Sequence, residues 1–194
     1  MKKMKIQKGC AGYLRAKKMR TMITTILAFA LVAAIVITGY ITTHTRLNML
    51  TLVAVLGCLP ACRLLVSLIM LMPHHSIDEA KELEISGVTE ELTVVYDLVV
   101  TSEKKVMPIE VATIFNNTVC GYVSSNKVDT TYAADHIKSI MKQNHLDKVT
   151  VKLFHDYKAF LTRAEGMNNI ASVEQTDTRR HEEEIKEILL DISL

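Results

Sequence analysis

Two long apolar runs dominate the first third of the chain. The run from Thr21 to Tyr40 contains no charged residue, and a second run extends from Leu47 to Met72. Each is long enough for a helix to cross a hydrocarbon core about 30 Å thick, which takes about 20 residues. Backbone polar groups cannot stay unpaired in lipid, so both runs are predicted to be helical. The pattern therefore predicts a transmembrane hairpin, residues 21–40 and 47–72, joined by a short external loop at 41–46.

After residue 72 the hydrophobic pattern shortens to the periods of a globular domain. Capping residues and apolar stripes predict helices at 76–83, 129–144 and 156–166. β-Branched or alternating runs predict strands at 92–100, 107–115, 118–123 and 148–154. Asn116 and Asn117 tolerate positive φ, so they predict a tight hairpin turn between the second and third strands. Ser76 is predicted to cap the first of these helices, because Glu79 stands three residues later.

The order helix, three strands, helix, strand, helix predicts an α+β domain with a mixed four-stranded sheet at residues 73–166. Polar residues at 167–178 predict a linker. The segment 179–194 has Ile185, Ile188, Leu189 and Ile192 on one helical face, so it is predicted to be an amphipathic helix docked on this domain.

Charge is divided unequally between the two parts. Residues 1–72 hold ten of the 23 Lys and Arg and none of the 21 Asp and Glu, which leaves 13 basic against 21 acidic residues, a net charge of −8, in the remainder. An acidic domain is poorly suited to displacing counterions from phosphates, so nucleic acid is an unlikely partner. Eight basic residues precede the first span and the loop carries only Arg46, which predicts cytosolic amino and carboxyl termini at the cell membrane. Free thiols in the four cysteines are compatible with that compartment.

The first twenty residues form a basic arm. We expect this arm to adsorb to anionic lipid headgroups, where each basic residue contributes about 1 kcal/mol. The residues predicted to bind lipid are Lys2, Lys3, Lys5, Lys8, Arg15, Lys17, Lys18 and Arg20.

Arg63 interrupts the second apolar run, three residues after Pro60. One interpretation is that its side chain snorkels to the cytosolic headgroups, and we favour it because Arg63 is about 24 Å along a helix that starts at Leu47. The other is that Arg63 pairs with a carboxylate in the membrane. Neither predicted span contains Asp or Glu, so that carboxylate would belong to another subunit.

Asp97 and Glu110 are the acidic residues on predicted strands and are the candidate catalytic residues. The element order over residues 76–154 resembles the core of the restriction-endonuclease-like superfamily. That resemblance implies a divalent-metal site built from an Asp and a Glu-x-Lys on adjacent strands. Position 112 is Ala where the motif has Lys, and the next strand, Val119–Tyr122, has no carboxylate. The implied site is therefore degenerate.

The whole chain is similar to small two-span membrane proteins of Gram-positive bacteria, a group without an assigned activity. The segments that carry this resemblance are GCAGYLRAKKMR in the basic arm, the hairpin with its short loop, and YDLVVTSEKKVMPIEVA leading into CGY. The resemblance implies a bacterial integral membrane protein.

Three functions are compatible with the sequence. We favour a non-enzymatic, membrane-anchored cytosolic module that binds a protein partner or regulates a neighbouring membrane system. An altered metal-dependent nuclease-like enzyme is the alternative, and an accessory subunit of a membrane transport system that uses Arg63 is the third. No nucleotide-binding, hydrolase or zinc-protease motif is present, so no cofactor and no metal site is expected. The expected partners are the lipid bilayer and a membrane or cytosolic protein.

Overall fold

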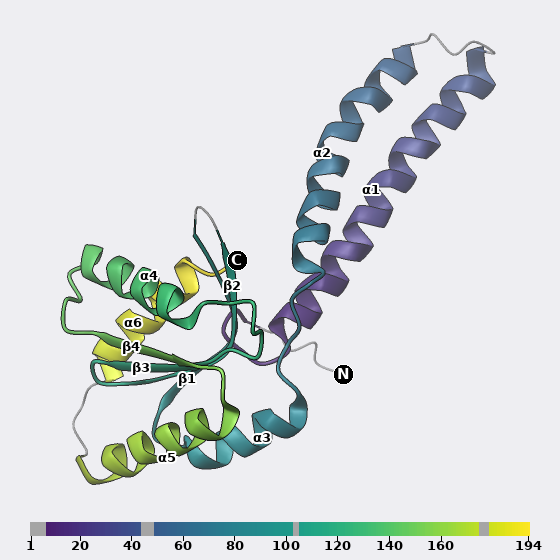
Figure 1. The fold of residues 1–194 in the computed structure, drawn as a ribbon. Helices are drawn as coiled ribbons and strands as arrows, with labels where there is room; N and C mark the ends of the chain where they lie inside the picture. The colour runs from purple at the N-terminus through teal and green to yellow at the C-terminus, as the bar shows by residue number, and fades with distance from the viewer. Residues whose placement is uncertain (1–6, 44–48, 103–104, 175–178) are drawn as a thin grey trace. The chain divides into compact units, whose positions relative to one another are not determined.

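The computed structural model describes residues 7–43, 49–102, 105–174 and 179–194. The chain divides into two compact units: residues 14–74, and residues 1–13 together with 75–194. The first unit is a helical hairpin, and the second is an α+β domain (Figure 1).

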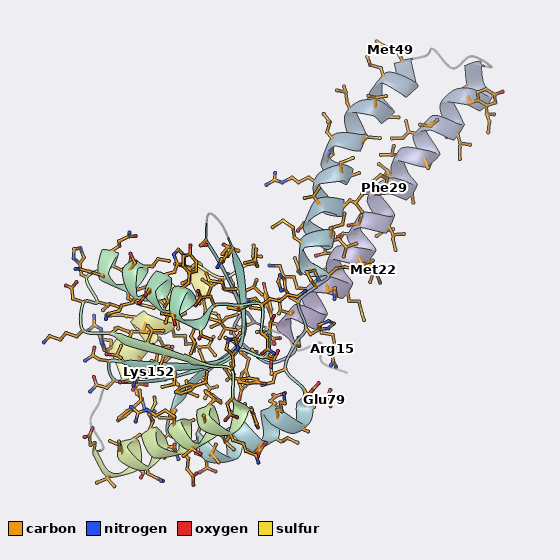
Figure 2. All side chains as sticks on the ribbon, viewed as in Figure 1. Arg15, Met22, Phe29, Met49, Glu79 and Lys152 are labelled. Carbon is orange, nitrogen blue, oxygen red and sulfur yellow. The ribbon has the colours of Figure 1, made fainter. Side chains whose placement is uncertain are left out.

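The hairpin consists of α1 (Tyr13–Thr43) and α2 (Met49–Leu71). Both helices are long and apolar enough to cross a membrane, and apolar side chains such as Met22 and Met49 are exposed on them (Figure 2). The helix α1 is longer than the predicted span 21–40, because it begins among the basic residues and ends at Thr43. Residues 41–43 of the predicted loop are therefore helical, and 44–48 are outside the described residues.

The two helices of the hairpin pack through residues spaced about seven apart. The buried positions with this spacing are Thr25, Val32 and Gly39 on α1, and Ala54, Ala61 and Leu68 on α2; Leu14 and Leu71 are buried as well. A Cβ added to Gly57 would lie 3.4 Å from Val32 Cγ2, so these two residues are at the same level of the hairpin. This spacing is the heptad pattern of two helices that cross at a small angle, with small residues allowing close approach.

Hydroxyl groups in α1 are hydrogen-bonded within the helix. Thr25 Oγ1 donates to the Thr21 carbonyl oxygen at 2.7 Å, and Thr38 and Thr42 donate one turn back at 2.8 and 2.6 Å. Hydroxyls paired in this way add little polar surface, which suits a helix in an apolar environment.

The α+β class and the mixed four-stranded sheet are confirmed. The elements of the domain are α3 (Glu79–Val88), β1 (Thr93–Thr101), β2 (Val106–Phe115), β3 (Thr118–Tyr122), α4 (Thr130–Gln143), β4 (Thr150–Phe154), α5 (Tyr157–Glu174) and α6 (Arg179–Asp191). The sheet order is β1-β2-β3-β4, with the first two pairs antiparallel and the last pair parallel. The helices α4 and α6 cover one face and α3 and α5 cover the other, which makes three layers (Figure 1).

Local sequence signals fix several boundaries as predicted. Asp129 caps α4 by accepting hydrogen bonds from the amides of Thr131 and Tyr132, both at 3.1 Å. Asp156 accepts from the Lys158 amide at the start of α5. Asn116 has φ +51° in the β2–β3 turn, a conformation that Asn adopts more readily than most residues. Each signal acts within a few residues, so the sequence alone reveals it.

Several boundaries differ from the prediction, and α3 also continues past the predicted end at residue 83 to Val88. The helix α5 continues through Gly166 to Glu174, so residues 167–174 of the predicted linker are helical, and 175–178 are outside the described residues. Ala164 and Met167 are buried on the same stripe of α5, and this tertiary packing carries the helix past Gly166. The prediction that Ser76 caps the first helix is also wrong, because α3 begins at Glu79 and Ser76 bonds elsewhere.

In both β1 and β2, the alternation of side chains between the two faces of the sheet reverses at the same level. Val95, Leu98 and Val100 share one core cluster, although strict alternation would place Val95 opposite the other two. The change occurs at Asp97, whose φ of +56° is in the left-handed region. In β2 the same cluster contains Ile109 and Ala112, which are three residues apart and would face opposite sides under strict alternation. The alternation of side chains therefore reverses beside Glu110. The pairing register is the same on both sides, which shows that no residue is inserted.

Candidate functional site

Asp97 is a buried carboxylate in the edge strand β1. Asp97 is 3% exposed, and its carboxylate accepts hydrogen bonds from Ser76 Oγ at 2.7 Å and from the Ile77 amide at 3.2 Å. Ser76 and Ile77 belong to the segment between α2 and α3. A buried carboxylate requires such donors, because burying it unpaired would cost several kcal/mol. Asp97 therefore attaches the segment that follows the hairpin to the sheet.

The segment that precedes the hairpin is attached at the neighbouring residue of β1. The Tyr96 amide donates to the Gly9 carbonyl oxygen at 2.8 Å. The chain before α1 and the chain after α2 thus meet β1 at two consecutive residues. We call Gly9, Ser76, Ile77, Tyr96 and Asp97 the hairpin junction, and all five residues belong to the α+β domain unit.

The carboxyl terminus joins the same edge of β1. The Leu194 amide donates to the Val99 carbonyl oxygen at 3.0 Å, and Ser193 Oγ accepts from the Val99 amide at 2.8 Å. Lys8 Nζ donates to the Ser193 carbonyl oxygen at 2.6 Å. An uncovered edge strand is a template for unwanted pairing, and here segments from both ends of the chain cover it.

Glu110 makes a separate interaction. It is opposite Asp97 in the register, between the pairs Tyr96↔Val111 and Leu98↔Ile109, and its Oε1 accepts a hydrogen bond from Ser124 Oγ. The two predicted catalytic carboxylates are therefore on adjacent strands at one level, but each is engaged by its own partners. Ala112 is buried in the core, so no lysine occupies the motif position. Among the described residues, no group of three or more His, Cys, Asp or Glu is arranged to hold a metal ion.

An aromatic cluster lies between the sheet and the α3–α5 layer. Lys81 Nζ lies 5.3 Å from the ring centre of Tyr122 and 5.2 Å from that of Tyr157, and these rings meet edge to face. The Tyr157 hydroxyl donates to Glu84 Oε2 at 2.7 Å. Burial, and then this hydrogen bond, raise the pKa of Tyr157. Burial and the charge of Glu82 raise the pKa of Tyr96 to about 12.

Cys120 is fully buried in β3 on the α3–α5 side of the sheet. Burial raises the pKa of its thiol, although Arg163 opposes that shift. His136 is on α4, which covers the other face, and its ring stacks on Tyr132. His155 Nδ1 lies 3.1 Å from the Val123 carbonyl oxygen. A buried neutral thiol is a poor nucleophile, so the arrangement does not support cysteine catalysis.

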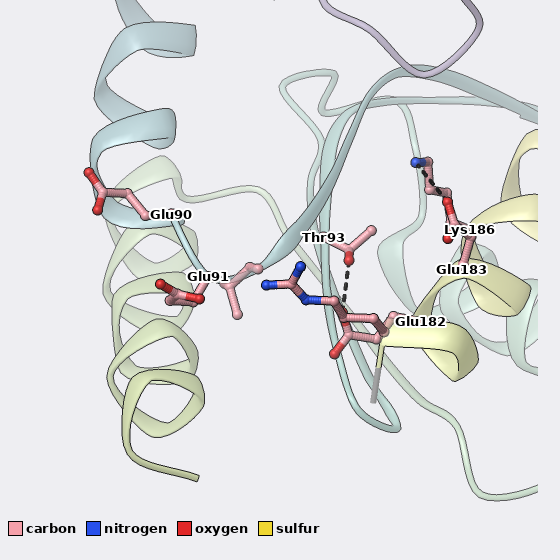
Figure 3. Close-up of a pocket in the computed structure, with 8 residues that line it drawn as sticks. Glu90, Glu91, Thr93, Glu182, Glu183 and Lys186 are labelled. Atoms are coloured by element: carbon pink, nitrogen blue, oxygen red, sulfur yellow. Dashed lines mark hydrogen bonds and ion pairs between the residues drawn. The ribbon is translucent and has the colours of Figure 1, made fainter. Parts of the chain in front are cut away.

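A cavity of about 280 Å³ lies between the first turn of α6 and the start of β1 (Figure 3). Its lining residues are Glu90, Glu91, Leu92, Thr93, Arg179, Glu182, Glu183 and Lys186. Glu182 is 3% exposed and accepts from Thr93 Oγ1 at 2.8 Å and from the Asn116 amide at 3.0 Å. His181 Nε2 lies 2.9 Å from Asn117 Oδ1. The first turn of α6 thus holds the β2–β3 turn, and docking of this helix is confirmed.

The predicted membrane-binding residues are distributed over both units. Lys2, Lys3 and Lys5 are outside the described residues, and Lys8 contacts Ser193 in the domain. Arg15, Lys17, Lys18 and Arg20 are on the first two turns of α1, where Lys18 Nζ donates to the Met72 carbonyl oxygen at 2.7 Å. Arg63 is exposed on α2 and is not one of the buried positions through which α2 packs on α1.

Sequence reasoning missed the hairpin junction and Glu182. Gly9 and Tyr96 interact through backbone atoms, for which side-chain patterns give no signal. Glu182 stands in the run His181–Glu184, where every residue is polar, so the run gives no signal that one of its side chains is buried. The one local sequence signal was Asp97 itself, since an aspartate within a β-branched run is unusual.

Comparison of the chain with protein-family models, with curated proteins and with solved structures finds no match.

Proposed function

We propose that the chain is a membrane-anchored protein whose α+β domain is a non-enzymatic binding or regulatory module on the cytosolic side of the cell membrane. The observation that carries this proposal is the hairpin junction. Tyr96 and Asp97 hold the two segments that continue into α1 and α2. A displacement of either segment must therefore act on β1, and through Val99 on the carboxyl-terminal residues that follow α6.

The state of the carboxylates supports a non-enzymatic role. Asp97 is buried and hydrogen-bonded to a connecting segment, which is a structural use of the residue. A catalytic metal site needs several oxygen ligands that converge on one point. The nuclease-like enzyme stays the second candidate, because Asp97 and Glu110 stand opposite each other on adjacent strands.

Titration calorimetry separates these two candidates. Purified full-length protein in detergent is titrated with Mg²⁺ and then with Mn²⁺. A non-enzymatic module gives no saturable heat. Saturable binding that disappears in both Asp97→Asn and Glu110→Gln would overturn the proposal in favour of the enzyme. Glu183→Gln, a change at an exposed carboxylate of α6, is the matched control.

Membrane anchoring and orientation need a separate experiment. All four cysteines are replaced by serine or alanine, and one cysteine is added after Leu194. The protein should stay in the membrane fraction after carbonate extraction. An impermeant maleimide should label the added cysteine only after the cells are permeabilised. Release by carbonate, or labelling in intact cells, contradicts the proposed anchoring or orientation.

A further inference from the structure

We propose that Arg63 is a docking residue for a transmembrane helix of a different membrane protein, which supplies an intramembrane Asp or Glu to pair with its guanidinium. This inference rests on the proposed membrane anchoring and names the kind of partner. The argument starts from the level of Arg63 within the hairpin.

Val32 on α1 and Gly57 on α2 are in contact, so they give a common reference point for depth along the two helices. From it, Arg63 is six residues further along α2, about 9 Å, toward the end where the basic residues of α1 are found. Arg20 is twelve residues back along α1, about 18 Å, in the same direction. Arg63 is therefore about 9 Å deeper than the last basic residue of α1. The hydrogen bond from Lys18 to Met72 agrees with this, because Arg63 is nine residues from Met72.

The direction of the side chain opposes snorkelling. In an α-helix each Cα–Cβ bond tilts toward the amino terminus. In α2 the amino terminus is at the external end of the hairpin, so the Arg63 side chain starts toward the middle of the membrane and away from the nearer, cytosolic surface. This direction argues against snorkelling, the interpretation that the sequence alone favours.

The positive charge of Arg63 has no partner of opposite charge among the described residues of its own chain. In the described ranges it makes no hydrogen bond or ion pair, and it is surrounded on the outer face of α2 by exposed Leu59 and Val66. An unpaired cation among apolar side chains is costly in lipid, and such groups normally face a partner of opposite charge.

The partner cannot be a second copy of this chain at this level. Residues 1–77 contain no Asp or Glu, so a dimer of hairpins would bring together two cations and no carboxylate. Charge complementarity therefore requires a different protein. Its carboxylate must lie in a transmembrane helix, roughly 9 Å inside the level at which the basic residues of α1 end.

The test uses the full-length protein in native membranes with a photo-crosslinking residue at position 66, one turn from Arg63. We expect a crosslink to a membrane protein that has an Asp or Glu in a transmembrane helix. Arg63→Ala should reduce the yield at least about tenfold, Arg63→Lys should retain most of it, and Leu59→Ala should leave it nearly unchanged. The same probe at position 37, exposed on α1, should not give this crosslink.

A second arm changes the partner. Replacing the captured protein's carboxylate by its amide should cause the same loss. The proposal is overturned if the probe reaches only lipid, if Arg63→Ala leaves the yield unchanged, or if the captured protein has no intramembrane carboxylate. In each case carbonate extraction shows whether anchoring still holds, so failure of this inference is distinguishable from failure of the proposed function.

Discussion

Ser76 Oγ donates a 2.7 Å hydrogen bond to Oδ2 of Asp97, which is 21 residues later in the chain. This bond ties the segment after α2 to the edge strand of the sheet. One residue earlier, the Tyr96 amide ties the segment before α1 to the same strand. The edge strand of the domain therefore holds both the segment before α1 and the segment after α2.

Asp97 supplies both a carboxylate and an unusual backbone conformation. Asp97→Asn keeps the preference for positive φ but loses the charge, so the free energy of unfolding should fall by about 1 to 3 kcal/mol. Asp97→Ala should lose about 1 kcal/mol more than Asp97→Gly, because alanine resists φ +56° and glycine does not. Urea denaturation of the detergent-solubilised full chain measures all three variants. Equal losses in the alanine and glycine variants would contradict the backbone part of this account.

Tyr96 gives the domain a stability that depends on pH. Its pKa is raised to about 12, above the ordinary value near 10, so the folded state keeps the proton in a range where the unfolded state has lost it. The contribution is complete below about pH 10 and is lost as pH rises toward 12. Tyr96→Phe should flatten the fall of the unfolding free energy across that range.

The charge of Glu82 contributes to this shift, so Glu82→Gln should lower the pKa of Tyr96 toward its ordinary value. The difference spectrum of the tyrosines near 295 nm, compared between the parent and Tyr96→Phe, isolates this titration. A Tyr96 that titrates near pH 10 in the parent protein would refute the burial argument.

Glu182 and Glu183 are neighbours on α6 with opposite environments. Glu182 is buried and accepts two hydrogen bonds from other elements, whereas the Glu183 side chain is 68% exposed and pairs loosely with Lys186. Glu182→Ala should cost about 2 to 4 kcal/mol and speed amide hydrogen exchange throughout α6. Glu183→Ala should change stability by less than about 0.5 kcal/mol. Similar exchange rates in the two variants would mean that Glu182 does not hold α6.

Two glycines should respond in opposite directions to alanine. A Cβ at Gly121 would lie 2.7 Å from Leu153 Cδ2 and 3.3 Å from the Val111 carbonyl oxygen, so Gly121→Ala should cost about 1 to 3 kcal/mol. At Gly166, inside α5, nothing lies within 4 Å of the added Cβ. Gly166→Ala should therefore stabilise the protein by about 0.5 to 1 kcal/mol. Thermal denaturation of both variants decides the matter, and a destabilised Gly166→Ala would argue against the continuous helix α5.

The sequence by itself determined the elements whose signals are local. The two apolar runs predicted the paired helices, since their length and composition are properties of single segments. Asp129 and Asp156 marked helix starts because a cap acts on amides two or three residues away. Asn116 marked the hairpin turn for a similarly local reason, the cost of positive φ for other residues.

Only the tertiary structure decided how distant segments use these residues. Asp97 was a candidate for catalysis in the sequence, and its role depends on Ser76 and Ile77, which no periodicity places beside it. The level of Arg63 depends on the contact between Val32 and Gly57, which a count of residues from Leu47 did not give. Such pairings arise from packing between elements, and a sequence pattern reports the preferences of one element at a time.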